Sequence, residues 1–165
     1  MYKFEIVNLT ELLEETLTLL QNHPSFDSRY RIEKQFPPQP VFASVDPDRM
    51  RQVFWNLGDN ALKAMPNGGV VSATVRADGK RVEILFRDTG IGLTPQQAEK
   101  IFEPFQSEFE RGTGLGLAIV YQIIQAHKGA IRAESAERGC VFRIELPHVV
   151  PSTSPAALRD ELVRK

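Results

Sequence analysis

The chain has 165 residues, of which 42% are apolar and 25% charged, and its formal net charge is -1. This length fits one domain with its own core. The balanced charge provides no excess of positive charge that would favour binding to nucleic acid or to an anionic membrane. The single cysteine, Cys140, excludes an internal disulfide and favours a reducing cytoplasm. No apolar run approaches the roughly 20 residues of a spanning helix, and no signal peptide is visible. We therefore expect a soluble, monomeric, cytoplasmic domain.

The first elements follow from periodicity and from turn residues. Tyr2–Leu9 alternates weakly between apolar and polar residues. Thr10 is expected to cap a helix, because the leucines after it recur at helical spacing until Pro24. Short strands are expected over Arg29–Phe36 and Val41–Val45, separated by prolines that cannot donate to a sheet.

The second helix has the clearest signals at both ends. Asp46 is a good N-cap, and Pro47 fits the first turn of a helix. Apolar residues then recur at helical spacing to about Met65, after which Pro66-Asn67-Gly68-Gly69 ends the helix. The apolar series is Met50, Val53, Phe54, Leu57 and Ala61.

The second half of the chain alternates strands with helices. Asp78-Gly79 is typical of a hairpin turn between two alternating strands. Thr94-Pro95 begins a short helix to Phe102, and the polar stretch Glu103–Gly114 is expected to be a loop. The remaining expectations are strands over Val70–Arg76, Arg81–Arg87, Ala130–Ser135 and Val141–Leu146 and a helix over Leu115–His127.

Strands that pair mainly as hairpins, with helices between them, predict an α+β fold. The expected architecture is a two-layer α/β sandwich, in which helices cover one face of one mixed, mostly antiparallel sheet. Residues 1–147 are expected to form this domain. Residues 148–165 are expected to form a tail, whose stretch Ala156–Lys165 favours a short exposed helix.

Three polar residues follow one face of the second helix. Asn56, Asn60 and Lys63 are spaced four and three apart, which places them on a narrow arc beside the apolar series. Amide oxygens can bind a hard cation such as Mg²⁺, while a lysine binds phosphate. A solvated face with two chance asparagines is the simpler alternative.

Asp88-Thr89-Gly90-Ile91-Gly92 follows an expected buried strand. Its glycines allow close approach of a ligand to the backbone, and a buried carboxylate requires donors. The exocyclic amine of adenine is a suitable donor, whereas guanine presents an oxygen at that place. The alternative is an ordinary Asp-Gly turn between a strand and a helix.

Gly112-Thr113-Gly114-Leu115-Gly116-Leu117 leads from the polar loop into a helix. Amide groups at a helix start can bind phosphate, although neither a Walker loop nor a Rossmann fingerprint is present. A mobile hinge is the alternative. Upstream, Phe102-Glu103-Pro104-Phe105 provides aromatic anchors, a pattern that by itself more often reflects core packing.

Together, these motifs resemble in order and spacing the N, G1, F and G2 boxes of sensor histidine kinases, over roughly Phe4 to Pro147. The resemblance implies the Bergerat ATP-binding fold, shared with gyrase, the Hsp90 chaperones and MutL. The short Glu-Pro-Phe entry to the lid resembles the nitrogen-regulation and pilus-regulation branches. ATP and Mg²⁺ are the implied cofactors.

The resemblance also implies a role for each matched residue. Asn60 corresponds to the magnesium ligand, Asn56 supports it, and Lys63 reaches a phosphate, so these three form the catalytic set. Asp88 corresponds to the adenine reader, and Phe105 to Thr113 to a flexible ATP lid. The other implied ATP-binding residues are Gly90, Gly92, Phe102, Phe105, Arg111, Gly112, Thr113, Gly114, Leu115, Gly116 and Leu117.

Asn56 bears on the acceptor of the phosphoryl group. ATP-hydrolysing relatives have a glutamate there as the base that activates water, and an amide cannot take that proton. A neutral imidazole needs no such base. His23, His127 and His148 do not match the family's acceptor motif, so the acceptor is expected on a separate dimerisation domain. The parent is then a homodimeric kinase, with or without a membrane anchor, that serves a response regulator.

Two departures and three rival functions accompany this interpretation. The lid has Gln106-Ser107-Glu108 where a threonine and lysine are common, with Arg111 as a substitute. Only the weak thiol of Cys140 stands where many relatives place a hydroxyl near the adenine aspartate. The rivals are an ATP-hydrolysing relative, a nucleotide-binding module without transfer, and an aspartic protease. The last is considered because Asp88-Thr89-Gly90 has the Asp-Thr-Gly sequence of that family's motif.

Overall fold

The computed structural model describes residues 1–104 and 115–150. Its centre is a five-stranded sheet with the strand order β2-β4-β5-β7-β6. β2 runs parallel to β4, whereas the other three neighbouring pairs are antiparallel. This confirms the mixed, mostly antiparallel sheet. The strands are β2 (Tyr30–Gln35), β4 (Gly69–Ala77), β5 (Arg81–Asp88), β6 (Ala130–Ser135) and β7 (Cys140–Pro147).

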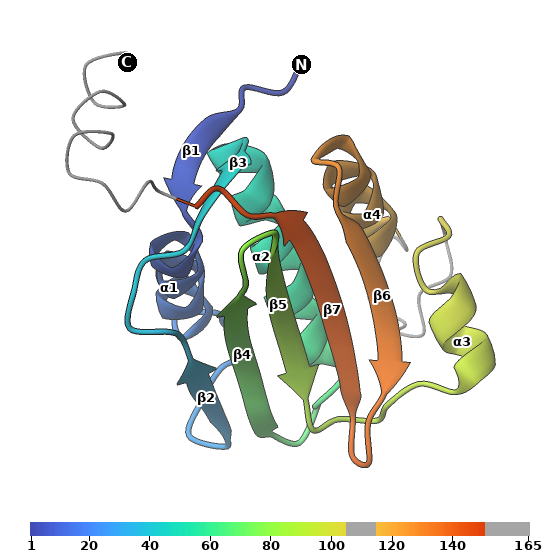
Figure 1. Ribbon diagram of the computed structural model, residues 1–165. Helices are drawn as coiled ribbons and strands as arrows, with labels where there is room; N and C mark the ends of the chain where they lie inside the picture. The colour runs from blue at the N-terminus through green and yellow to red at the C-terminus, as the bar shows by residue number, and fades with distance from the viewer. Residues whose placement is uncertain (105–114, 151–165) are drawn as a thin grey trace, which may run out of the picture.

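Helices cover one face of this sheet, as predicted. In Figure 1, α1, α2 and α4 lie behind the sheet with α2 in the middle, and the short α3 lies beside the edge strand β6. α2 contacts both neighbouring helices as well as β4 and β5. The helix with the polar stripe is therefore central to its layer. The helices are α1 (Leu9–Leu20), α2 (Pro47–Lys63), α3 (Pro95–Lys100) and α4 (Gly116–Ala126).

The core lies between the two layers because each element presents apolar residues at its own period. Met50, Phe54 and Leu57 of α2 are at most 1% exposed, and so is Ile84 of β5. Burying a side chain of this size contributes about 1.5–3 kcal/mol. Tyr30 packs in a smaller apolar cluster at the C-terminal ends of α1 and α2. Its hydroxyl donates a hydrogen bond to the Met65 carbonyl (2.7 Å).

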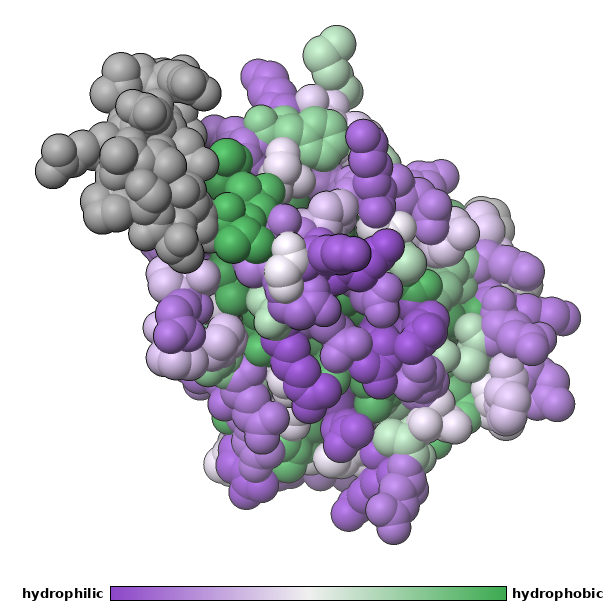
Figure 2. Space-filling view, viewed as in Figure 1, coloured by the Kyte–Doolittle hydropathy of each residue, from purple (hydrophilic) through white to green (hydrophobic). Residues whose placement is uncertain are grey.

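The opposite face of the sheet is polar, as the many hydrophilic residues in Figure 2 show. Arg143 of β7 pairs with Glu83 of β5 (2.8 Å) and with Glu134 of β6 (3.4 Å). Glu83 also pairs with Arg76 of β4 (3.7 Å). Individual exposed pairs stabilise little. Charges in these positions nevertheless keep the face solvated, which explains why the domain has two layers and not three.

A second, smaller sheet accompanies the predicted one. β1 (Glu5–Asn8) and β3 (Phe42–Val45) pair antiparallel to each other and lie outside the five-stranded sheet. The prolines after β2 redirect the chain, so β3 pairs with β1 instead of adding to the main sheet. The backbone N–H of Val149 also donates to the carbonyl of Phe42 (3.0 Å).

The boundaries of two helices differ from those expected. Asn8, and not Thr10, caps α1: its Oδ1 accepts from the Glu11 N–H (3.3 Å) and from the Thr10 hydroxyl (2.7 Å). The assignment of the cap to Thr10 was wrong because asparagine is an equally good cap two residues earlier. α3 ends at Lys100 and not at Phe102, and Thr94 caps it as predicted. Among residues 1–104 and 115–150, no helix is both long and apolar enough to cross a bilayer.

Candidate functional site

The polar stripe lies on α2, beside the buried apolar face of that helix. Asn56 and Asn60 are half-buried, and Lys63 is exposed. Asn56 Nδ2 donates to the backbone carbonyl of Gly116, the first residue of α4 (3.2 Å). This bond joins the helix with the stripe to the start of the helix that follows the glycine-rich segment.

Lys63 is held by an acid that the sequence motifs did not include. Its Nζ lies 3.0 Å from Oδ2 of Asp59, one helical turn earlier. An acid four residues before a lysine is a recognised helix pair, so the spacing contained the signal. Asp59 thus belongs to the polar face together with the three predicted residues.

Asp88 is the last residue of β5 and is 2% exposed. Its Oδ1 accepts the backbone N–H of Gly90 (2.9 Å), and the backbone N–H of Cys140 also donates to the carboxylate. Burial raises the pKa of Asp88, and the two hydrogen bonds oppose that rise. A carboxylate has about four acceptor positions, so this one can still accept a further donor from a ligand.

Cys140 supports Asp88 through its backbone and not through its side chain. The register of β5 and β7 places the two residues opposite each other, which presents the Cys140 N–H to the carboxylate. Burial, followed by the charge of Asp88, raises the pKa of the Cys140 thiol to about 12. The thiol therefore stays protonated at neutral pH.

Two glycines allow the chain segments around Asp88 to approach closely. A Cβ on Gly90 would lie 2.1 Å from the Ala64 carbonyl oxygen, and a Cβ on Gly139 would lie 1.9 Å from the Asp88 carbonyl oxygen. The Ile91 N–H donates to the same Ala64 oxygen (3.0 Å). The loop after β5 is thus bound to the end of α2. Gly90 belongs to a motif visible in the sequence, whereas Gly139 does not and was missed.

The start of α4 lies next to Asn56. Leu115 is the N-cap residue of α4, and its apolar side chain makes no capping hydrogen bond there. Backbone amides in the first turn of such a helix are suited to bind an anion. Leu117 packs partly against the core, so it anchors the helix start.

Phe102 anchors the chain before the glycine-rich segment. Its ring lies 5.8 Å from that of Tyr121 on α4 and 6.0 Å from that of Phe142 on β7. These contacts match the packing alternative for this aromatic residue. The other residues of the expected lid and phosphate loop, Phe105, Gln106, Ser107, Glu108, Arg111, Gly112, Thr113 and Gly114, lie outside the described residues.

The structure thus brings three of the predicted motifs together along α2. Asn56 binds the start of α4, and Ala64, just after Lys63, binds the loop that follows Asp88. Among residues 1–104 and 115–150, no group of three His, Cys, Asp or Glu side chains could hold a metal. Asn56 and Asn60 offer amide oxygens on this face, and such oxygens can bind a hard cation.

Residues 45–150 match the family model of histidine kinase-, DNA gyrase B- and HSP90-like ATPases. Sporulation kinase E of Bacillus subtilis (strain 168) is 36% identical over 147 residues, which cover 87% of this chain and 20% of that protein. Sporulation kinase B of the same organism is 31% identical over 153 residues, which cover 92% of this chain and 35% of that protein. The chain thus spans about a third or less of the length of these curated relatives.

Solved structures agree with the sequence comparison. Full-length ShkA in complex with AMPPNP superposes with a TM-score of 0.80 and 30% identity, covering 93% of this chain and 33% of that one. The histidine kinase ThkA in complex with the response regulator TrrA gives a TM-score of 0.73 and 29% identity, covering 88% and 42%. The chain therefore belongs to the histidine kinase-, DNA gyrase B- and HSP90-like ATPase family, as an ATP-binding domain of the sensor histidine kinase type.

Proposed function

We propose that the chain binds ATP together with Mg²⁺ and transfers the γ-phosphoryl group to a histidine on a separate dimerisation domain. The observation that carries this proposal is the buried carboxylate of Asp88, which two backbone N–H groups fix in place at the end of β5. The remaining acceptor positions suit the exocyclic amine of adenine. Guanine would place an oxygen against this carboxylate, and leaving such a buried group unpaired costs about 1 to 3 kcal/mol.

The phosphates and the metal are proposed to bind to residues of α2 and to the start of α4. Asn60 is the proposed magnesium ligand, and Asn56 is held beside α4 by its bond to Gly116 (3.2 Å). Lys63 is the proposed phosphate partner. Bound Mg²⁺ would neutralise charge on the transferred group, while the protein supplies positioning. Arg111 and residues 112–114 remain proposed contacts of the phosphates.

The proposed acceptor is a histidine outside this chain. His23 is bonded to Asp59 (2.9 Å), His127 is buried between Asp46 and Ile123, and His148 is bonded to the Asp78 carbonyl. Each ring therefore already has a structural partner. Asn56 supports the same view. ATP-hydrolysing relatives have a glutamate at this position, and the amide of Asn56 cannot act as the base that activates water.

The partners proposed are the dimerisation domain of the same kinase and, indirectly, a response regulator. A relative, ThkA, was crystallised with the response regulator TrrA. We propose that residues 1–147 form the catalytic domain, with residues 148–165 as a tail, in the cytoplasmic part of a homodimeric kinase. The fold and the family leave no support for an aspartic protease.

Calorimetric titration of the chain with Mg-ATP and Mg-GTP tests the role of Asp88. ATP is expected to bind more tightly than GTP, and Asp88→Asn is expected to weaken ATP binding by roughly 5- to 150-fold. Asp48→Asn is the matched control, because the side chain of Asp48 is 89% exposed on the first turn of α2. Equal affinity of the unaltered chain for both nucleotides would contradict the role given to Asp88.

A further inference from the structure

Three side chains, those of Trp55, His23 and Asp59, form a connected series of contacts that ends at the ammonium group of Lys63. The carboxylate of Asp59 bridges two donors: Oδ2 lies 3.0 Å from Lys63 Nζ, and Oδ1 lies 2.9 Å from His23 Nε2. The ring of His23 stacks on that of Trp55, with centroids 5.6 Å apart and an interplanar angle of 29°. His23 comes from the turn after α1, whereas the other three residues lie on α2.

The hydrogen bonds of His23 indicate the tautomer of its ring. The backbone N–H of Ser25 donates to Nδ1 (3.0 Å), so Nδ1 carries no proton. The proton of the neutral ring is therefore on Nε2, which donates to Asp59. His23 thereby contacts one carboxylate oxygen of Asp59, and the other oxygen is directed to Lys63.

Burial makes this arrangement more rigid than an ordinary surface pair. The side chain of His23 is 16% exposed and that of Asp59 is 27% exposed. Stacking on Trp55 and the bond from Ser25 fix the ring on two sides. Asp59 is thus anchored before it contacts the flexible lysine.

We propose that Asp59 and His23 are positioning residues that orient the Lys63 ammonium for the nucleotide phosphates. The inference rests on the proposed function, because it concerns how Lys63 reaches phosphate. A lysine side chain has many rotamers, and restricting them when a ligand binds weakens that binding by several-fold. The anchored carboxylate restricts these rotamers in advance, so less of that cost falls on nucleotide binding.

Calorimetric titration of the 165-residue chain with Mg-ATP tests this role. Asp59→Asn is expected to weaken binding by about fivefold, since the lysine loses its charged partner. His23→Ala is expected to weaken binding by a smaller factor, and His23→Gln is expected to restore it, because the glutamine amide can donate to Asp59 in the same way. Tighter binding by Asp59→Asn would overturn the inference, since it would mean that Asp59 holds Lys63 away from the phosphates.

A double-mutant cycle shows whether Asp59 acts through Lys63. Lys63→Met is expected to weaken binding, and adding Asp59→Asn to it is expected to have no further effect. A full additional loss in the double variant would indicate a structural role for Asp59 and overturn the inference. Unchanged binding by Lys63→Met would also overturn it, while ATP binding by the unaltered chain would leave the proposed nucleotide function standing.

Two controls accompany the cycle. Trp55 is the only tryptophan of the chain and stacks on His23, so its fluorescence reports whether each variant keeps the cluster folded. Glu14→Gln removes an acid of α1 that pairs with Lys34 of β2, outside the proposed site, and is expected to leave ATP binding unchanged. No ATP binding by the unaltered chain would instead contradict the proposed function and the inference together.

Discussion

The carboxyl group of Asp88 lies where ionisation is unfavourable for folding. Burial raises its pKa above the ordinary 3.8, so the folded chain retains this proton to a higher pH than the unfolded chain does. The resulting destabilisation is absent below the unfolded pKa and complete above the folded pKa. The ionised carboxylate is nevertheless the form proposed to accept the adenine amine, so the proposed recognition uses the form of Asp88 that lowers the stability of the fold.

Because ionisation of Asp88 destabilises the fold, the stability of the Asp88→Asn variant is expected to depend on pH differently from that of the unaltered chain. The free energy of unfolding of the variant, minus that of the unaltered chain, is expected to increase from about pH 4 until the raised pKa is passed, and then to level off. Urea unfolding at several pH values measures the difference. A difference that decreases with rising pH would contradict the assignment.

Gly90 and Gly79 form a matched pair for testing the loop after β5. A Cβ at Gly90 would collide with the Ala64 carbonyl at the end of α2, whereas a Cβ at Gly79 meets no atom within 4 Å. Gly90→Ala is expected to lower the unfolding free energy by more than about 1 kcal/mol and to weaken ATP binding. Gly79→Ala is expected to stay within about 0.5 kcal/mol in the same assays. Equal losses would show that the contact with Ala64 is unimportant.

At the level of residues, the sequence revealed the candidate groups whose side chains stand in spaced motifs. Asn56, Asn60, Lys63 and Asp88 could all be selected in this way. Gly139 could not, because it acts through backbone geometry created by the pairing of β5 with β7. Cys140 was noted for its thiol, whereas its contact with Asp88 is made by its backbone N–H. His23 was missed for a related reason, since its contact with Asp59 joins residues 36 positions apart. Asp59 itself could have been selected from its i,i+4 spacing to Lys63.

Helix α1 illustrates how one amphipathic element stabilises the domain. Leu13 is fully buried against the core, whereas Leu19 is 59% exposed on the same helix. Leu13→Ala is expected to lower the unfolding free energy by about 2–5 kcal/mol, and Leu19→Ala by about 0.5 kcal/mol or less. Urea unfolding with a fitted midpoint provides the comparison. Similar losses for both variants would contradict the packing of α1 against the core.

Element by element, periodicity predicted the helices and the strands that bury an apolar face. It succeeded for α2 because Asp46, Pro47 and the apolar series agree. It did not predict the separate sheet of β1 and β3, since pairing between residues 5–8 and 42–45 depends on long-range packing and not on local pattern. The cap at Asn8 was missed because two good capping residues stand two positions apart.

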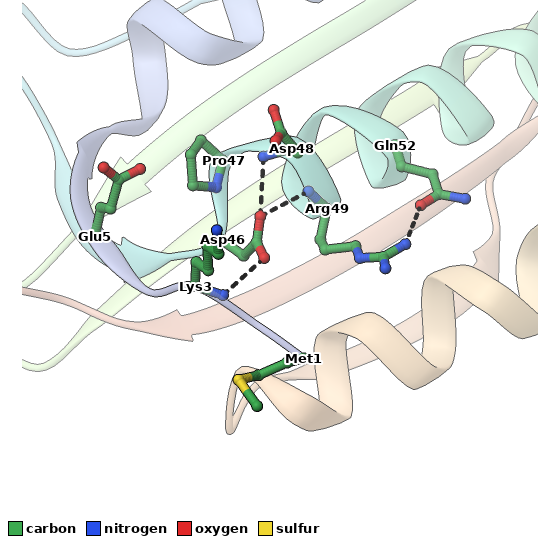
Figure 3. Close-up of a pocket in the computed structure, with 8 residues that line it drawn as sticks. All are labelled: Met1, Lys3, Glu5, Asp46, Pro47, Asp48, Arg49 and Gln52. Carbon is green, nitrogen blue, oxygen red and sulfur yellow. Dashed lines mark hydrogen bonds between the residues drawn. The ribbon is translucent and has the colours of Figure 1, made fainter.

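At the scale of the whole molecule, Asp46 and His127 join three parts of the chain. His127 Nδ1 donates to the Ile123 carbonyl (2.7 Å), so Nε2 accepts the backbone N–H of Asp46 (3.0 Å). The Asp46 carboxylate caps α2 and also accepts the Lys3 N–H (2.9 Å), as Figure 3 shows. The end of α4, the start of α2 and the segment before β1 are thus held at one point.

Removing the imidazole of His127 is expected to weaken the contact between the end of α4 and the start of α2. His127→Ala leaves the buried N–H of Asp46 without its partner, which should lower the unfolding free energy by about 1–3 kcal/mol. His148→Ala is the control, because His148 bonds to the Asp78 carbonyl at an exposed position. Denaturant unfolding distinguishes the two. A loss for His127→Ala no greater than that of the control would contradict this role.

As a whole, the domain is proposed to hold ATP for a histidine on another domain. The most direct measurement adds the dimerisation domain of the kinase to the chain with ATP labelled at the γ-phosphate. We expect acid-labile, base-stable label on that domain, lost with Asn60→Ala. Label absent despite ATP binding would contradict transfer, and steady phosphate release by the isolated chain, lost with the same variant, would instead identify an ATP-hydrolysing domain.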